Sequence, residues 1–166
     1  MFNLDFSRRG LLAGGALAAI GATFAACSRS TPAAAAETYA VTHSPAEWKR
    51  RLGPDRYRIL RQAGTEAPGS SPLNNEHRRG IFSCAGCALP LYSSATKFDS
   101  GTGWPSFYAA LPNAVRNRVD GAWGMSRTEE HCRRCGGHLG HVFDDGPKPT
   151  GKRHCINGLS LTFRPA

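Results

Sequence analysis

The chain has 166 residues, of which 40% are hydrophobic and 20% charged, and its formal net charge is +9. This length suggests one domain with its own hydrophobic core, plus extra segments. The basic residues stand in twos and threes, without a long run or interleaved aromatic residues. The charge therefore favours a solvated surface over one that binds nucleic acid or an acidic membrane.

The first 36 residues are predicted to be an export leader. Arg8 and Arg9 precede an uncharged run over residues 11–26, and small residues before Glu37 offer cleavage sites. This pattern is typical of a twin-arginine signal, and the run is shorter than the ~20 apolar residues of a spanning helix. We therefore expect a signal peptide and linker over 1–36, a folded domain over 37–166, and a periplasmic or otherwise exported protein.

The leader could be processed in either of two ways. The sequence "FAAC", Phe24 to Cys27, resembles a lipoprotein processing site, which would place a lipid anchor on Cys27. Phe24 departs from the aliphatic residue usual at the start of that motif. Cleavage after Ala36 would instead release a soluble protein, and we favour this ending.

Two short helices are predicted at the start of the domain. Ser44 suits the N-cap, Pro45 the first helical position, and Glu47 completes a capping box. Gly53 ends this helix, and residues 54–64 repeat the pattern between a proline and a glycine. We expect both helices to cover one side of the core.

The rest of the chain is predicted to be a loop followed by strands. Residues 65–80 have the Pro, Gly, Ser and Asn content of a loop. Over residues 80–165, short apolar pieces are broken every few residues, and Asp120-Gly121 between two of them indicates a hairpin. The expected fold class is mainly β, with antiparallel sheets packed as an open barrel or sandwich behind short N-terminal helices.

Four of the six cysteines form two C-x-x-C pairs, Cys84 with Cys87 and Cys132 with Cys135. Two such knuckles far apart in one chain are typical of a tetrahedral four-thiolate zinc site. The alternatives are iron on the same ligands, two redox-active pairs, or two disulfides. We predict one structural Zn²⁺ ion, bound in the cytoplasm because twin-arginine export carries folded proteins.

Cys155 is then the one free thiol of the predicted mature domain. A lone cysteine is more often a small buried hydrophobe than a nucleophile. However, three cationic residues, 152–154, immediately precede it, and nearby cations favour the reactive thiolate. Upstream, His138 and His141 could donate to a substrate oxygen or transfer a proton, or serve as structural residues.

Three segments carry a resemblance to a known family. The sequences "KFDSGTGWPSF", "HCRRCGGHLGHVFDDGPKPTGKRHCINGLSLTF" and "CAGCALPLYSS" resemble the B-type methionine sulfoxide reductases, and the resemblance runs over residues 44–163. It implies reduction of the R epimer of methionine sulfoxide, in oxidised proteins or as the free amino acid. The partners implied are oxidised proteins and a thiol reductant, thioredoxin-like or small. We expect no nucleic acid partner, and a monomer.

The resemblance also implies roles for individual residues. Cys155 attacks the sulfoxide sulfur and is left as a sulfenic acid. Trp104 forms an apolar wall for the substrate methyl group, and Arg153 helps to hold the thiolate. The sulfoxide oxygen is faced by His138, His141 and Asn157, with Asp145 in support.

The sequence departs from the family pattern at three positions. Many members carry a resolving cysteine where this chain has Thr102, so the resemblance implies a one-cysteine enzyme recycled by an external thiol. His154 replaces the tyrosine usual before the nucleophile, and Gly158 replaces a usual serine.

Two other hypotheses remain at this point. The knuckles and the positive charge permit an exported zinc-ribbon binding module without catalytic activity, for nucleic acid or another ligand. The export signal argues against a nucleic acid ligand. The other hypothesis is a structural zinc protein in which Cys155 is buried and inert.

Overall fold

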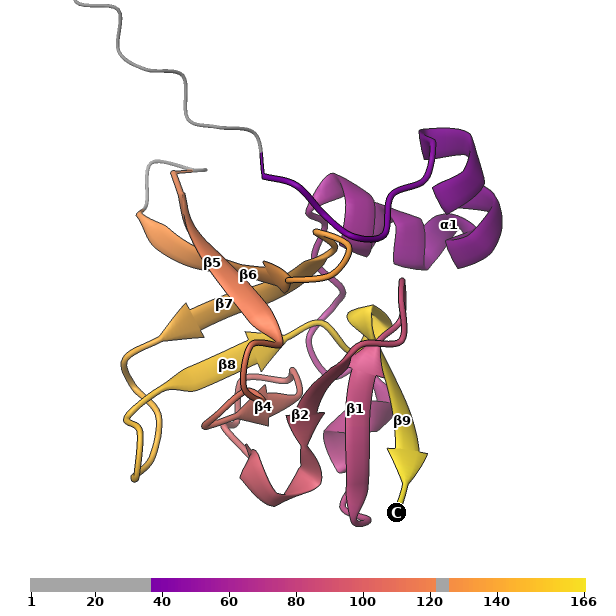
Figure 1. Ribbon diagram of the computed structural model, residues 1–166. Coiled ribbons are helices and arrows are strands. Elements are labelled where there is room, and N and C mark those ends of the chain that lie inside the picture. The colour runs from indigo at the N-terminus through magenta and orange to yellow at the C-terminus, as the bar shows by residue number, and fades with distance from the viewer. Residues whose placement is uncertain (1–36, 122–125) are drawn as a thin grey trace, which may run out of the picture. The chain divides into compact units, whose positions relative to one another are not determined.

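The domain begins with helix α1, Pro45–Gln62, in the computed structural model, which describes residues 37–121 and 126–166 (Figure 1). The Ser44 side chain caps the helix and accepts a hydrogen bond from the Glu47 N–H at 3.2 Å. Gly53 breaks the helical geometry, with φ 70° and ψ 174°. The two predicted helices are therefore confirmed as two halves of α1 on either side of this break. The leader predicted over 1–36 lies outside the described residues.

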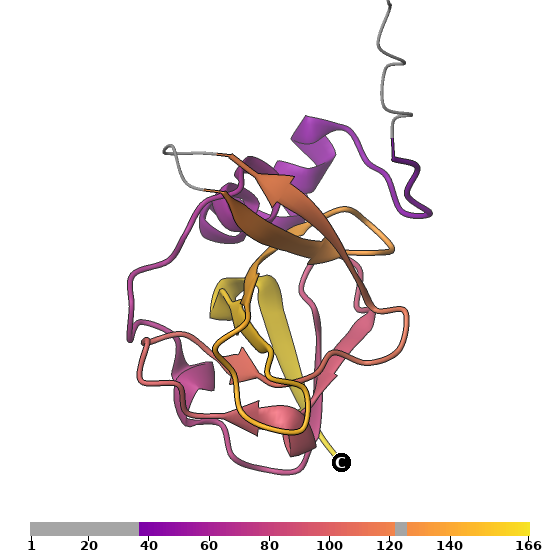
Figure 2. The same ribbon diagram turned by 90° about the vertical axis from the view of Figure 1, so that its left-hand side faces the viewer.

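Helix α1 covers one side of the core, as its pattern of apolar residues predicts. Trp48, Ile59 and Leu60 are its buried residues, and the helix packs against strand β7, His138–Phe143, and the short helix η4, Gly158–Ser160. Figure 1 and Figure 2 both place α1 at the end of the domain away from the C-terminus, together with the hairpin of β5, Val115–Asp120, and β6, Arg127–Cys132.

In the described residues, nine strands form two antiparallel sheets, which confirms the predicted mainly β fold. The smaller sheet has the order β2-β1-β9 and consists of β1, Gly80–Cys84, β2, Pro90–Ser93, and β9, Leu161–Pro165. The larger sheet has the order β3-β4-β8-β7-β6-β5. Its remaining strands are β3, Lys97–Phe98, β4, Ser106–Phe107, β5, Val115–Asp120, β6, Arg127–Cys132, and β8, Arg153–Ile156.

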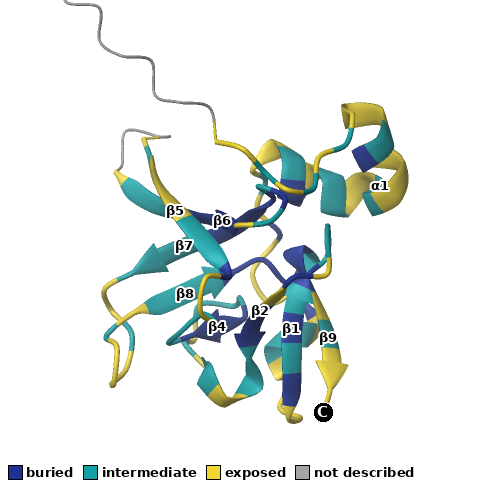
Figure 3. Cartoon of the chain, in the orientation of Figure 1, coloured by how far each residue is buried: buried dark blue, intermediate teal, exposed yellow. Residues whose placement is uncertain are grey.

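The two sheets share an aromatic core. Phe82 of β1 meets Phe107 of β4 edge-on at 5.0 Å between ring centroids, and Tyr92 of β2 stacks on Phe107 at 4.4 Å. All three rings are fully buried, and Figure 3 shows buried positions on β1, β2 and β4. These contacts hold the smaller sheet against the strand that neighbours β8.

The predicted hairpin at Asp120-Gly121 is confirmed, with a longer connection than a two-residue turn. The last residue pair of β5 and β6 is Asp120 with Arg127, so residues 121–126 connect the strands. The loop predicted over 65–80 contains one short helix, η1, Pro72–Asn75, and another, η2, Ser94–Thr96, follows β2. Within the described ranges, no helix has the length and apolar character needed to cross a membrane.

Candidate active site and metal centre

Strand register brings the predicted nucleophile together with residues far away in the sequence. Cys155 of β8 lies opposite Ser106 of β4 on one side and opposite His141 of β7 on the other. Directly opposed residues of antiparallel strands project to the same face of a sheet. The order β4-β8-β7 therefore places Cys155 between two polar neighbours on one face.

Cys155 lines a small pocket of about 140 Å³ on this face. Trp104 and Phe143 supply its aromatic walls, and His141 and Asn157 supply polar groups. The structure thus brings together four of the residues predicted from the sequence: Cys155, Trp104, His141 and Asn157. The remaining lining residues are Thr65, Arg127 and Gly140.

Glu66 holds Trp104 and Asn157 in place around this pocket, a role that the sequence did not predict. The Trp104 indole N–H donates to the Glu66 carbonyl at 3.2 Å, and the Glu66 N–H donates to Asn157 Oδ1 at 3.0 Å. The Glu66 carboxylate is only 4% exposed and accepts the N–H groups of Gly158 and Leu159 at 2.5 and 3.0 Å. These partners lie about ninety residues away in sequence, so no local pattern reveals them.

His141 is oriented by a carboxylate, and burial acts on its pKa. Its Nε2 lies 2.8 Å from Asp120 Oδ2, and the same oxygen pairs with Arg127 Nη2 at 2.7 Å. Burial is the main cause that lowers the pKa of His141 below its usual 6.5, although the hydrogen bond with Asp120 opposes this effect. A neutral imidazole that donates Nε2–H to Asp120 keeps Nδ1 as an acceptor.

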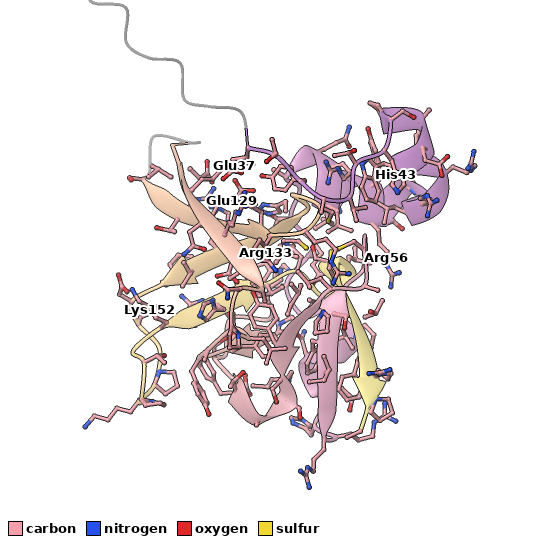
Figure 4. The ribbon with its side chains drawn as sticks, in the orientation of Figure 1. Glu37, His43, Arg56, Glu129, Arg133 and Lys152 are labelled. Carbon is pink, nitrogen blue, oxygen red and sulfur yellow. The ribbon has the colours of Figure 1, made fainter. Side chains whose placement is uncertain are left out.

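His138 lies behind His141, outside the set of described residues that line the pocket. Its ring meets that of His141 edge-on, with centroids 5.6 Å apart, and its Nδ1 lies 2.7 Å from Glu129 Oε1. Arg118 pairs with the same carboxylate, which lies on β6 (Figure 4). Burial would raise the pKa of Glu129, but the hydrogen bonds from His138 and Arg118 outweigh it and lower this pKa to about 2. His138 Nε2 is buried and has no hydrogen-bond partner in the described part of the chain.

Of the three cations before Cys155, Arg153 alone shares its face of β8, because side chains alternate along a strand. Its guanidinium makes two hydrogen bonds of 2.8 Å to Asp145 and lies over the Phe143 ring at 4.4 Å. Asp145 is the main cause that raises the pKa of Arg153, and the negative charge of Cys155 contributes further. The structure therefore places Asp145 on Arg153 and not beside the histidines that the resemblance assigned to it.

The other two cations point elsewhere. Lys152 pairs with Asp144 on the exposed loop between β7 and β8 (Figure 4). His154 turns to the opposite face, where its Nδ1 lies 2.6 Å from Oε2 of the fully buried Glu130. Tyr92 donates to the other oxygen of that carboxylate. His154 therefore belongs to a buried hydrogen-bond cluster and not to the pocket.

The four paired cysteines form a separate cluster with the geometry of a metal site. Their sulfur atoms all lie within 4.8 Å of one another, with Cys84 and Cys135 at 3.7 Å and Cys87 and Cys132 at 3.5 Å. A tetrahedral ion with Zn–S bonds of 2.3 Å separates its sulfurs by about 3.8 Å, so the four thiols fit zinc. The knuckles follow β1 and β6, and a ligand from each pair would link the two sheets.

Comparison with known proteins agrees with this arrangement of residues. The SelR domain model matches residues 52–165. A peptide methionine sulfoxide reductase MsrB of Thiobacillus denitrificans is 56% identical over 121 residues, which are 72% of this chain and 92% of the relative. The MsrB proteins of Methanosarcina barkeri and Agrobacterium fabrum are 53% and 52% identical, over 75% of this chain and 89% and 93% of their own lengths. The chain belongs to the MsrB family. It is a peptide methionine sulfoxide reductase.

Reduction of a sulfoxide places chemical demands on the site where it occurs. A sulfoxide is a poor electrophile until its oxygen accepts a proton or a strong hydrogen bond, so a reductase needs a thiolate beside donors. Cys155 is the thiol that lines this pocket, and the polar groups of the pocket lie around it. Thr102 also reaches the site, with its Oγ1 3.7 Å from the Cys155 sulfur.

Proposed function

We propose that this chain reduces the R epimer of methionine sulfoxide in oxidised proteins, and the free amino acid as a second substrate, with Cys155 as the nucleophile. The observation that carries the proposal is the position of Cys155 in a small pocket with an aromatic wall at Trp104 and polar groups at His141 and Asn157. The proposed role is repair of oxidised methionine.

The proposed reaction is a two-electron exchange between two sulfur atoms. The Cys155 thiolate attacks the sulfoxide sulfur and forms an S–S bond, while the sulfoxide oxygen takes up a proton. The hydroxyl group then passes to the Cys155 sulfur as that bond breaks. Methionine leaves in its reduced form, and the cysteine becomes a sulfenic acid, which is one step up the oxidation ladder.

Selection of the R epimer requires three fixed contacts around the substrate sulfur. The methyl group lies against Trp104, the oxygen faces the polar side of the pocket, and the sulfur faces Cys155. Methyl and sulfur groups pack well on aromatic rings. The mirror arrangement would exchange the methyl group and the oxygen, which would place a polar atom on the indole.

Recycling of Cys155 depends on an external thiol in this proposal. Thr102 stands where many members have a resolving cysteine, and four of the five cysteines in the described residues form the metal cluster. Two molecules of a thiol, or one dithiol of thioredoxin type, reduce the sulfenic acid to thiol and water and become a disulfide.

We also propose a structural zinc ion at the four-cysteine cluster. Zinc would replace weak thiol contacts by strong ligand bonds and so join β1 to β6. The site has four protein ligands and no position for substrate, which gives it no part in the reaction.

Export by the twin-arginine route completes the proposal. A protein that repairs methionine in an oxidising compartment benefits from a metal site filled before export, because free thiols there form disulfides. A lipid on Cys27 would keep the protein at the membrane, and cleavage after Ala36 would release it.

A stereospecific assay tests the proposed activity. R- and S-sulfoxide dipeptides are supplied with dithiothreitol to wild type and to Cys155→Ser, and methionine formation is measured. We expect turnover of the R epimer alone, and loss of activity to background in the variant. Activity on the S epimer alone, or an active Cys155→Ser protein, would refute the proposal.

A further inference from the structure

A row of three hydroxyl groups leads from the interior of the domain to the sulfur of Cys155. Thr102 Oγ1 lies 3.7 Å from the Cys155 sulfur and 2.8 Å from Ser100 Oγ, which in turn lies 2.7 Å from Ser106 Oγ. Ser106 is fully buried, and its hydroxyl is placed to donate to the Trp104 carbonyl, 3.2 Å away. The row thus connects the reacting sulfur to a fixed backbone acceptor.

The backbone around Thr102 keeps this row in place. Gly101 and Gly103, on either side of it, have φ angles of 69° and 91°, which other residues rarely adopt. The Gly103 carbonyl accepts the Gly69 N–H at 2.7 Å and the Asn74 side chain at 2.9 Å. These bonds fix the loop between β3 and β4 against the 65–80 segment, so Thr102 needs no rearrangement to reach Cys155.

The proton count of the row gives it two arrangements. Each hydroxyl has one proton, which it can donate to one neighbour. With the protons directed inward, the last one goes to the Trp104 carbonyl, and Thr102 is free to accept from the Cys155 S–H. With the protons directed outward, Ser106 donates to Ser100, Ser100 to Thr102, and Thr102 to the Cys155 sulfur. The second arrangement matches a thiolate, which accepts hydrogen bonds and donates none.

We propose that Thr102 is a further catalytic residue, whose hydroxyl, ordered by Ser100 and Ser106, donates a hydrogen bond to the Cys155 thiolate. This inference rests on the proposed role of Cys155 as nucleophile. Position 102 keeps two features that a resolving cysteine needs, proximity to the Cys155 sulfur and a fixed loop, but it carries a hydroxyl donor in place of a thiol. Arg153 adds positive charge beside the Cys155 sulfur, while Asp145 holds its guanidinium through two hydrogen bonds.

The test measures thiolate formation without any sulfoxide. Zinc-loaded protein is alkylated with iodoacetamide from pH 5 to pH 10, and the peptide that contains Cys155 is quantified by mass spectrometry. Thr102→Val keeps the branched shape but has no hydroxyl, whereas Thr102→Ser keeps the hydroxyl. We expect the midpoint of the alkylation rate against pH to rise by about one unit in Thr102→Val, because the thiolate loses a hydrogen-bond donor. A rise of one unit corresponds to about a tenfold loss of thiolate at neutral pH. Thr102→Ser should keep the wild-type midpoint.

Two further measurements separate donation from a merely structural role. Ser100→Ala should move the midpoint in the same direction by a smaller amount, because Thr102 keeps its hydroxyl but loses its partner; this variant also serves if Thr102→Val fails to fold. Reduction of the R-sulfoxide by Thr102→Val should recover toward wild type at high pH, where the thiol ionises without the bond. Equal midpoints in wild type, Thr102→Val and Ser100→Ala would overturn the inference. A Cys155→Ser protein that still reduces sulfoxide would instead overturn the proposed function.

Discussion

At the residue scale, the side chains of the site are held in place by hydrogen bonds to other groups of the protein. Asn157 Oδ1 accepts a hydrogen bond from the Glu66 N–H, and Asn157 Nδ2 donates to the Leu139 carbonyl at 3.0 Å, which leaves one N–H for the substrate of the proposed reaction. His141 is likewise held by Asp120. Such bonds fix the pocket before substrate arrives, so the remaining Asn157 N–H loses little free energy on reorganisation.

Thr102 gives a prediction about redox state at this scale. Because its Oγ1 lies 3.7 Å from the Cys155 sulfur, a sulfur atom at the same position would be within reach of a disulfide after small adjustments. We expect Thr102→Cys, treated with methionine sulfoxide without reductant, to lose both thiols and two mass units. Wild type should instead give a sulfenic acid that a cyclic diketone traps.

Ser100→Cys is the matched control for this change. Its side chain lies behind Thr102 in the row of hydroxyls, so its new thiol should stay free under the same treatment. A Thr102→Cys protein that keeps two free thiols after turnover would contradict the geometry described here.

At the element scale, the sequence predicts features that depend on neighbouring residues better than contacts between distant ones. The capping pattern at Ser44 and the glycine at 53 act within a few residues, and both predicted helix halves are present. The C-x-x-C spacing also acts locally, and the four thiols meet as predicted. Contacts between residues far apart in the sequence are a non-local property, so the contacts of Glu66 with Gly158 and Leu159 became visible only in the structure.

The four-cysteine cluster lies between elements of the two sheets. Because its ligands follow β1 and β6, which belong to different sheets, an ion there would cross-link the two. We expect one zinc per chain by a chromogenic chelator assay. Cys84→Ser should lose the metal and several kcal/mol of unfolding free energy, on the order of 3 or more, as structural zinc sites contribute to folding directly.

Cys155→Ser is the control for that loss, since its sulfur lies outside the cluster. It should retain one zinc and the wild-type denaturation midpoint. If Cys84→Ser unfolded at the same denaturant concentration as wild type, the cluster would have no structural role.

At the scale of the whole domain, acid stability is set by carboxylates that are buried and paired. Glu129 is 5% exposed, bonded by His138 and Arg118, and its pKa is lowered from 4.5 to about 2. The folded state therefore holds this group ionised where the unfolded chain protonates it. Its contribution to stability is fully present above pH 4.5 and is lost as the pH falls toward 2.

Glu129→Gln should remove this contribution. The variant keeps the shape of the side chain but loses the charge. Its unfolding free energy at pH 7 should therefore be lower by roughly 2–3 kcal/mol, a range whose upper end follows from the lowered pKa of Glu129. As the pH falls from 5 to 2, the wild type should lose stability faster, and the gap between the two proteins should close. Urea unfolding at several pH values measures this gap. Because both proteins keep the four cysteines, acid release of metal affects them alike, and a gap that stays constant down to pH 2 would show that the carboxylate pair does not control acid stability.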